Sequence, residues 1–224
     1  MYLTKKEQLR GFVYLALSLL IIPKLLPFSV QLLFPEAAGA APNFACFVCN
    51  FLCTAVIFRK HLKAGAMRLF LTPVRLGTVV VLGLCSYFAL NRLVSAVILT
   101  VYPDFVNVND NTVHTLLSQD FYLMAVGTVF LVPVAEELLY RTLIFGSFLQ
   151  KSPVLAYLIS VPVFCAIHVL PYVGKYSLPV LACCFLQYTP AGICLGWAYQ
   201  KSGTVFAPIL IHAIINALGI AAVR

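Results

Sequence analysis

Long apolar runs separated by short polar connections predict a chain of membrane-spanning helices. A spanning helix needs about 20 mostly apolar residues. Seven stretches approach or exceed this length: residues 9–33, 42–58, 76–101, 119–150, 153–171, 177–199 and 203–222. Proline interrupts the first stretch at Pro23 and Pro27 and the fourth at Pro133, so we expect both helices to kink or break. Few residues remain for a domain exposed to water.

The composition indicates the same class of protein. Hydrophobic residues make up 62% of the 224-residue chain and charged residues 10%, and the mean hydropathy is +0.99. A soluble domain carries about 25% charged residues to wet its surface, so this chain needs lipid as its solvent. The sequence therefore predicts an all-α, polytopic transmembrane helix bundle with about seven spans.

The excess of positive charge predicts the orientation in the membrane. The chain carries 15 Lys and Arg against 7 Asp and Glu, a net charge of +8. In a soluble protein this balance could indicate a nucleic-acid partner, but here it indicates cytoplasmic loops that face anionic lipid headgroups. With seven spans, one side receives most of the basic residues: Lys5, Lys6, Arg10, Arg59, Lys60, Lys63, Arg68, Arg75, Lys151 and Lys201. We expect this side, and with it the N-terminus, to be cytoplasmic.

Smaller signals predict packing rather than chemistry. The eight cysteines lie inside apolar runs, so we expect buried thiols and no metal, although Cys46, Cys49 and Cys53 share one helical face. Gly192 and Gly196 form a Gly-x-x-x-Gly sequence, which predicts close helix approach within this chain. His61 lies in a polar connection and is expected to be solvated. The sequence does not indicate an oligomeric state.

Two adjacent carboxylates lie near the predicted middle of the fourth span. An ionisable residue inside a membrane costs about 2.5 to 3.5 kcal/mol, which makes it a functional candidate. Glu137 and Arg141 are four residues apart on one helix face and can pair, whereas Glu136 points about 100° away. Such different environments are typical of carboxylates with separate acid and base roles. The alternative is a structural Glu–Arg bridge.

Two further helices carry polar pairs at comparable depth. The fifth span contains Phe164 and His168 and the last contains His212 and Asn216, each pair spaced i, i+4 on one face. A lone membrane histidine is more often an interhelical hydrogen-bond partner than a catalyst. Polar groups on three helices together favour a buried active site. They supply a base, a second proton carrier and neutral donors, which can activate water and stabilise an oxyanion.

The three motifs in this order resemble those of the CPBP family, which contains the type II CAAX prenyl proteases and related bacteriocin-processing or immunity-associated membrane proteins. The motifs read Glu-Glu-x-x-x-Arg, Phe-x-x-x-His and His-x-x-x-Asn, and the resemblance covers about residues 120–220. It implies a catalytic core in residues 119–224, built from the last four helices. Residues 1–118 would then hold the N-terminal transmembrane helices and the basic cytoplasmic connection.

The resemblance also implies an intramembrane glutamate protease without a cofactor. Glu136 and His168 would activate water, and His212 and Asn216 would hold the oxyanion. Supporting roles are expected for Glu137, Arg141 and Phe164. The implied substrate is a prenylated C-terminus or a peptide precursor presented at the bilayer.

One residue departs from the family pattern. Thr142 follows Arg141 where the family commonly has glycine. We therefore expect a narrower entrance beside the site and an altered choice of substrate.

Other functions use the same residues. In a zinc protease, Glu137, His168 and His212 would supply three ligands with water as the fourth, although no His-Glu-x-x-His sequence is present. Survival of activity after chelation separates the two mechanisms. A non-enzymatic immunity or scaffold protein would keep its phenotype in a Glu136→Gln variant. A transporter would use Glu136 and His168 as a proton relay.

Overall fold

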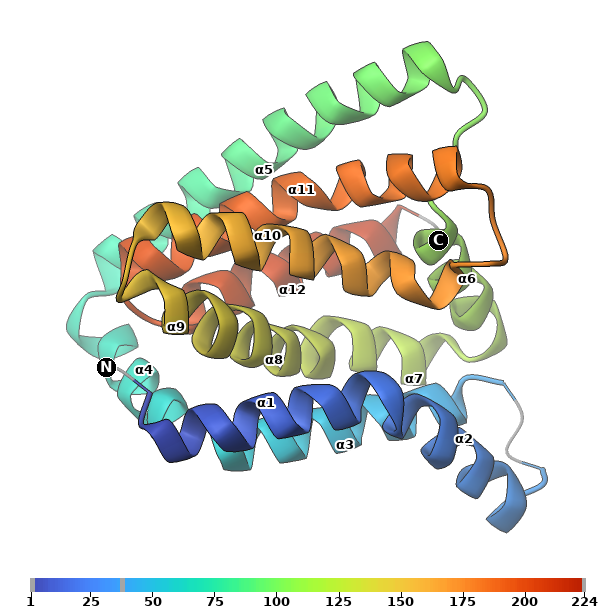
Figure 1. Ribbon diagram of the computed structural model, residues 1–224, viewed down its shortest axis with the longest axis horizontal. Coiled ribbons are helices and arrows are strands. Elements are labelled where there is room, and N and C mark those ends of the chain that lie inside the picture. Colours follow the sequence, from blue (N-terminus) through green and yellow to red (C-terminus); the bar gives the residue numbers. More distant parts are fainter. Residues whose placement is uncertain (1–2, 37–38, 223–224) are drawn as a thin grey trace.

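The computed structural model describes residues 3–36 and 39–222, which form helices and no β-strand (Figure 1). In the first half these are α1 (Lys5–Leu20), α2 (Ile22–Leu33), α3 (Ala41–Ile57), α4 (Arg59–Leu71), α5 (Pro73–Val101) and α6 (Val108–Gln119). The second half begins with one continuous helix, made of α7 (Phe121–Val126), η1 (Gly127–Leu131), α8 (Val132–Glu137), η2 (Leu138–Phe145) and α9 (Gly146–Leu149). After it come α10 (Pro153–Val169), η3 (Leu170–Tyr172), α11 (Leu178–Ser202) and α12 (Phe206–Ala221).

All seven predicted apolar stretches are helical, and the chain is an integral multi-pass membrane protein. Among the described residues, four helices are long and apolar enough to cross a membrane alone: residues 73–101, 121–149, 153–172 and 178–202. Two more candidates are bent pairs, α1 with α2 at 57° and α3 with α4 at 84°. The all-α polytopic bundle is thus confirmed with four to six candidate spans rather than seven. The difference arises from these bends and from α12, which has 16 residues.

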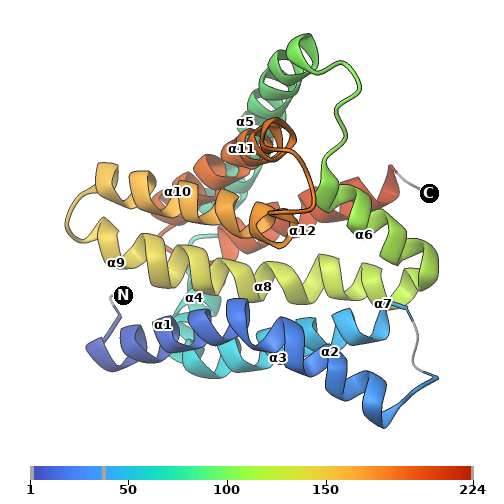
Figure 2. The same cartoon turned by 45° about the vertical axis from the view of Figure 1, so that its right-hand side comes forward.

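The helices form layers around the segment 121–149. In Figures 1 and 2, α1 and α3 lie on one side of this segment, and α10 and α12 lie on the other with α11 and α5 beyond them. The expected close approach at the two glycines occurs within the chain. A Cβ on Gly192 would lie 3.0 Å from Val161, and one on Gly196 would lie 3.1 Å from Phe145 and from Tyr157.

The basic connection is an ordered helix rather than a solvated loop. Lys60 and Lys63 are exposed on α4, whereas His61 and Gly65 are buried. A Cβ on Gly65 would lie 2.7 Å from the Thr204 hydroxyl, so this face of α4 packs on the turn between α11 and α12. The prediction that His61 is solvated is therefore wrong, because tertiary packing buries one face of a helix whose sequence is polar.

Different segments of the chain lie at the two ends of the bundle. The N-terminal end of α1, helix α4, the α9–α10 turn and the α11–α12 turn lie at the same end (Figure 1). Arg75, in the first turn of α5, also lies at this end, because its Nε donates a hydrogen bond to the Lys201 carbonyl oxygen near the end of α11 at 3.1 Å. Helix α6 lies at the opposite end, where Leu117 packs with Ile220 of α12 (Figure 2).

We predict that Gly192→Leu destabilises the bundle. A leucine side chain would have to displace Val161, whose Cα lies 3.5 Å from the position of a Cβ. Overpacking of this kind costs about 1–3 kcal/mol, so the melting temperature of the detergent-solubilised protein should fall. Gly77→Leu is the matched control, because nothing lies within 4 Å of a Cβ at that helical position. Equal melting temperatures for the two variants would contradict the close contact between α10 and α11.

Candidate active site

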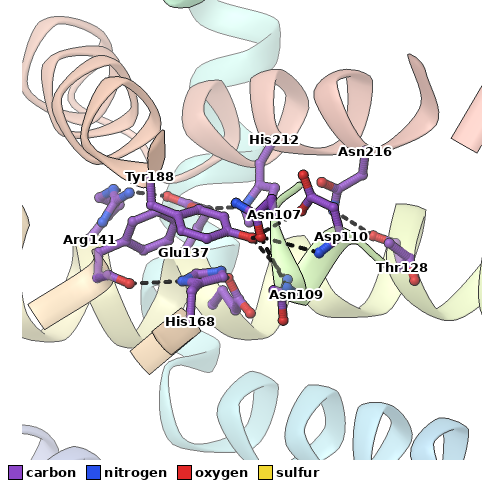
Figure 3. A network of polar contacts seen from close by, with 12 residues as sticks. Asn107, Asn109, Asp110, Thr128, Glu137, Arg141, His168, Tyr188, His212 and Asn216 are labelled. Atoms are coloured by element: carbon purple, nitrogen blue, oxygen red, sulfur yellow. Dashed lines mark hydrogen bonds and ion pairs between the residues drawn. The ribbon is translucent and has the colours of Figure 1, made fainter. Parts of the chain in front are cut away.

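Glu137 is the centre of a buried network of charges. Its Oε2 lies 3.2 Å from Arg141 Nε, and both side chains are completely buried. Its Oε1 lies 2.9 Å from His212 Nδ1, which reaches it from α12 (Figure 3). The pairing of Glu137 with Arg141, expected from their spacing, is confirmed. Both carboxylate oxygens are therefore engaged, and α8, η2 and α12 are joined at one point.

Phe164 fills the space between the members of this network. The Arg141 Cζ atom lies 4.5 Å from the centroid of its ring, a distance typical of a cation–π contact. The same ring lies 4.7 Å from the ring of His168 and 6.5 Å from that of His212. Phe164 thus packs against the arginine and both histidines.

Glu136 has a different environment from Glu137. It lies on the other side of α8, and its Oε2 is 3.9 Å from His168 Nε2, with 24% of the glutamate side chain and 14% of the histidine side chain exposed. The His168 Nδ1 atom lies 2.8 Å from the Phe164 carbonyl oxygen. A carbonyl only accepts, so Nδ1 carries the proton, and the Nε2 of a neutral ring is left as an acceptor beside Glu136.

In both His212 and Asn216, one polar atom makes a hydrogen bond to another helix, and a second polar atom remains available to a ligand. His212 Nδ1 is bound to Glu137, which leaves Nε2 available. Asn216 Nδ2 donates to the Thr128 carbonyl oxygen at 2.8 Å. That carbonyl lies in the π-helical segment η1, where the ordinary helical hydrogen bonds are displaced. The second N–H of the amide stays free for a ligand.

One cavity of about 580 Å³ brings these residues together. Glu136, Phe164, His168, His212 and Asn216 line it, whereas Glu137 and Arg141 lie behind its wall. Several polar residues that sequence patterns did not single out also line it: Asn50, Tyr87, Asn91, Asn107, Asn109, Asp110, Gln187 and Tyr188. Several of these come from residues 1–118, so the N-terminal half contributes to the cavity as well.

Helix α6 closes one side of the cavity and is held there by hydrogen bonds. The Asn107 side chain caps α6 by accepting from the Asn109 and Asp110 backbone N–H groups at 3.0 and 3.3 Å. Tyr188 of α11 donates to Asp110 Oδ1 at 3.0 Å and accepts from Asn109 Nδ2 at 3.0 Å (Figure 3). The Tyr188 ring also stacks on His168, with centroids 4.2 Å apart.

The polar residues of α6 had only a weak signal in the sequence. Asn107, Asn109 and Asp110 begin a helix, and asparagine is a preferred N-cap residue. That signal predicts where α6 starts. It does not predict that the first turn faces Tyr188, which is about 80 residues away in the chain.

Thr142 does not border this cavity. It is buried and lines a separate cavity of about 70 Å³ together with His61, Arg68 and Tyr199. The expectation that Thr142 narrows the entrance beside the site is therefore wrong. The π-helical segment η2 directs this side chain toward α4 and the end of α11.

Of the three ligands suggested for zinc, Glu137 is already engaged, because Arg141 and His212 bind its two carboxylate oxygens. Within residues 3–36 and 39–222, no group of three or more His, Cys, Asp or Glu side chains is placed to hold a metal ion. The eight cysteines are free thiols, but the expectation that all are buried is wrong, because Cys85 is exposed and only Cys165, Cys184 and Cys194 are fully buried.

Comparison with known proteins relates the site to a family. Residues 118–218, here called the Rce1-like segment, match the family model described as type II CAAX prenyl endopeptidase Rce1-like. The chain is also 32% identical over 94 residues to the UPF0177 protein YxdF of Lactococcus lactis subsp. lactis (strain IL1403), a match that covers 42% of this chain and 46% of that protein. The match thus spans about half the length of that relative. No solved structure matches the chain.

The family match is consistent with the resemblance to CPBP proteins, which is confirmed. The Rce1-like segment contains the three motifs from which the site was expected. It does not contain Asn107, Asn109 or Asp110, which precede it. The α6 side of the cavity is therefore built largely by residues outside the Rce1-like segment.

We predict that Arg141→Met destabilises the protein strongly. The substitution keeps the length of the side chain but leaves the Glu137 carboxylate buried with His212 as its remaining partner. Breaking a buried pair by removing one charge costs about 3–5 kcal/mol. Thermal unfolding in detergent should report this loss. Arg92→Met, in the exposed part of α5, is the control and should change the melting temperature little. A similar small change for Arg141→Met would mean that the network does not stabilise the bundle.

Proposed function

We propose that this protein is an intramembrane endopeptidase that hydrolyses a peptide bond inside the cavity. The family of residues 118–218 is described as an endopeptidase family. The observation that carries the proposal is the contrast between the two glutamates. Glu137 is locked between Arg141 and His212, whereas Glu136 faces the cavity beside His168. A carboxylate without a permanent partner is the group that can accept a proton from water.

Glu136 and His168 activate the water in this mechanism. Water held between the Glu136 carboxylate and His168 Nε2 loses a proton to Glu136 as its oxygen adds to the substrate carbonyl. The stack on Tyr188 and the bond to the Phe164 carbonyl fix the plane of the imidazole ring. When the C–N bond breaks, the proton on Glu136 passes to the departing amine.

His212 and Asn216 stabilise the negative charge that forms on the carbonyl oxygen. The Glu137 carboxylate accepts the Nδ1–H of His212, and a protonated ring then presents Nε2–H to the oxyanion. Asn216 adds its free N–H, and its bond to Thr128 fixes the amide plane. Neither group has to move far during the reaction, because each is held in place by its other contact.

The substrate is a short extended peptide segment presented at the bilayer, either a prenylated C-terminus or part of a peptide precursor. A cavity of about 580 Å³ admits a few residues and excludes a folded domain. Membrane lipids surround the bundle. We assign the end that carries α4 and the N-terminus to the cytoplasm, because Lys and Arg gather at the cytoplasmic side of membrane proteins.

Glu136→Gln should abolish peptide cleavage without unfolding the protein. The amide keeps the size and hydrogen bonding of the side chain but cannot accept the proton, and loss of a general base costs about 10²–10⁴-fold in rate. Purified wild-type and variant proteins are incubated with a peptide library, and products are identified by mass spectrometry. The exposed Glu36→Gln serves as the control and should cleave like the wild type. Cleavage by Glu136→Gln at the wild-type rate would refute the proposed base.

Chelation separates the proposed mechanism from the zinc alternative. We expect cleavage to survive prolonged treatment with 1,10-phenanthroline followed by removal of the chelator, since Glu136 and His168 supply the proton acceptors. The same peptide assay measures the outcome, with a known zinc protease treated in parallel. Loss of activity that zinc alone restores would favour a metalloprotease instead.

A further inference from the structure

The cavity has a charge that differs from that of the whole chain. Two carboxylates line it, Glu136 on α8 and Asp110 on α6. No Lys or Arg is among the described residues that line it, although the chain has a net charge of +8. The other titratable groups on its wall are Tyr87, His114, His168, Tyr188 and His212. A substrate group that enters the cavity therefore meets carboxylates and imidazoles but no permanent cation.

Asp110 is not needed to cap its own helix. Asn107 already accepts from the N–H groups at the start of α6, including that of Asp110. The Asp110 carboxylate accepts one hydrogen bond, from Tyr188 to Oδ1, and no ion pair with a described residue involves it. The carboxylate is solvent-accessible on the wall of the cavity, where a ligand can reach it. A cation beside Asp110 would be attracted to a charge that has no ionic partner among the described residues.

The position of Asp110 relates it to the reacting centre. Tyr188 donates to Asp110 through its hydroxyl and stacks on His168 through its ring. Asp110 and His168 therefore contact the same tyrosine side chain, one at its hydroxyl and the other on its ring face. Because an extended peptide advances about 3.3–3.6 Å per residue, the two groups would contact substrate positions only a few residues apart.

We propose that Asp110 forms a subsite for a cationic side chain, Lys or Arg, close to the scissile bond of the substrate. This inference rests on the proposed function. A Lys or Arg side chain would form a charge-assisted hydrogen bond with Asp110, and such bonds are stronger than neutral ones. The free carboxylate of a C-terminal tripeptide would find no Lys or Arg partner in the cavity. The preferred substrate is therefore an internal segment with a basic residue rather than a free C-terminus.

Peptides that differ at one position test the preference in the binding step. The Glu136→Gln protein is used so that peptides bind without turnover. Labelled Leu- and Ala-based peptides carry Lys, Gln or Glu at each position in turn, and their dissociation constants are measured by fluorescence anisotropy in detergent. At one or two neighbouring positions, we expect Lys to bind about 10-fold or more tightly than Gln, and Glu to bind more weakly than Gln.

The variant Asp110→Asn shows whether Asp110 causes the preference. Asparagine can still accept the Tyr188 hydrogen bond, so α6 should remain in place, and the melting temperature checks this. The preference for Lys over Gln should fall to within about 2-fold. Asp104→Asn, an exposed carboxylate before α6, should leave it unchanged.

The outcomes distinguish this inference from the proposed function. Equal binding of the Lys, Gln and Glu peptides, or a Lys preference that survives Asp110→Asn, would overturn the cationic subsite. If Asp110→Asn unfolds, the comparison of Lys with Glu peptides on the parent protein decides the matter. Failure of the wild-type protein to cleave any peptide would instead refute the endopeptidase, whatever the binding preference.

Discussion

A charged side chain inside an apolar bundle must be paired, and the Glu137–Arg141–His212 network is the consequence of that constraint here. The network joins α8 and η2 to α12, and Phe164 adds α10 through its contact with Arg141. These helices are the ones that carry the candidate site. Two of the residues that join these helices, Glu137 and Arg141, lie behind the cavity wall, whereas His212 and Phe164 also line the cavity.

The irregular backbone of the segment 121–149 also helps to hold the helices of the site together. Two π-helical stretches, η1 and η2, flank the short helix that carries both glutamates. Their displaced carbonyls accept side-chain hydrogen bonds from neighbouring helices: Asn216 donates to Thr128, and Ser160 donates to Tyr140 at 3.2 Å. The backbone of this segment is thus satisfied by α10 and α12, which fixes its rotation and keeps Glu136 directed at the cavity.

The sequence predicted those features that depend on one helix at a time. Apolar length located the helices, and the four-residue spacing of Glu137 and Arg141 predicted their pairing and the separate direction of Glu136. The individual partners that side chains meet on other helices were not predictable from spacing. Spacing within α12 could not reveal that His212 bonds to Glu137, a residue 75 positions away.

Contacts between helices also explain why the burial of some residues was predicted wrongly. The polar composition of α4 suggested a solvated connection, but neighbouring segments cover one face of this helix. His61 is consequently buried. Thr142 was expected beside the entrance because it stands where the family commonly has glycine, whereas η2 directs its side chain toward α4 and the end of α11.

The central claim is that the two adjacent glutamates have separate roles: Glu137 stabilises the folded bundle, and Glu136 takes part in catalysis. Thermal unfolding of the isosteric pair Glu136→Gln and Glu137→Gln, measured side by side in one detergent, tests it most directly. The account predicts a large fall in melting temperature for Glu137→Gln, because Arg141 would be left as an unpaired buried cation. Glu136→Gln should unfold close to the wild-type temperature. Equal falls for both variants, or a larger fall for Glu136→Gln, would contradict this division.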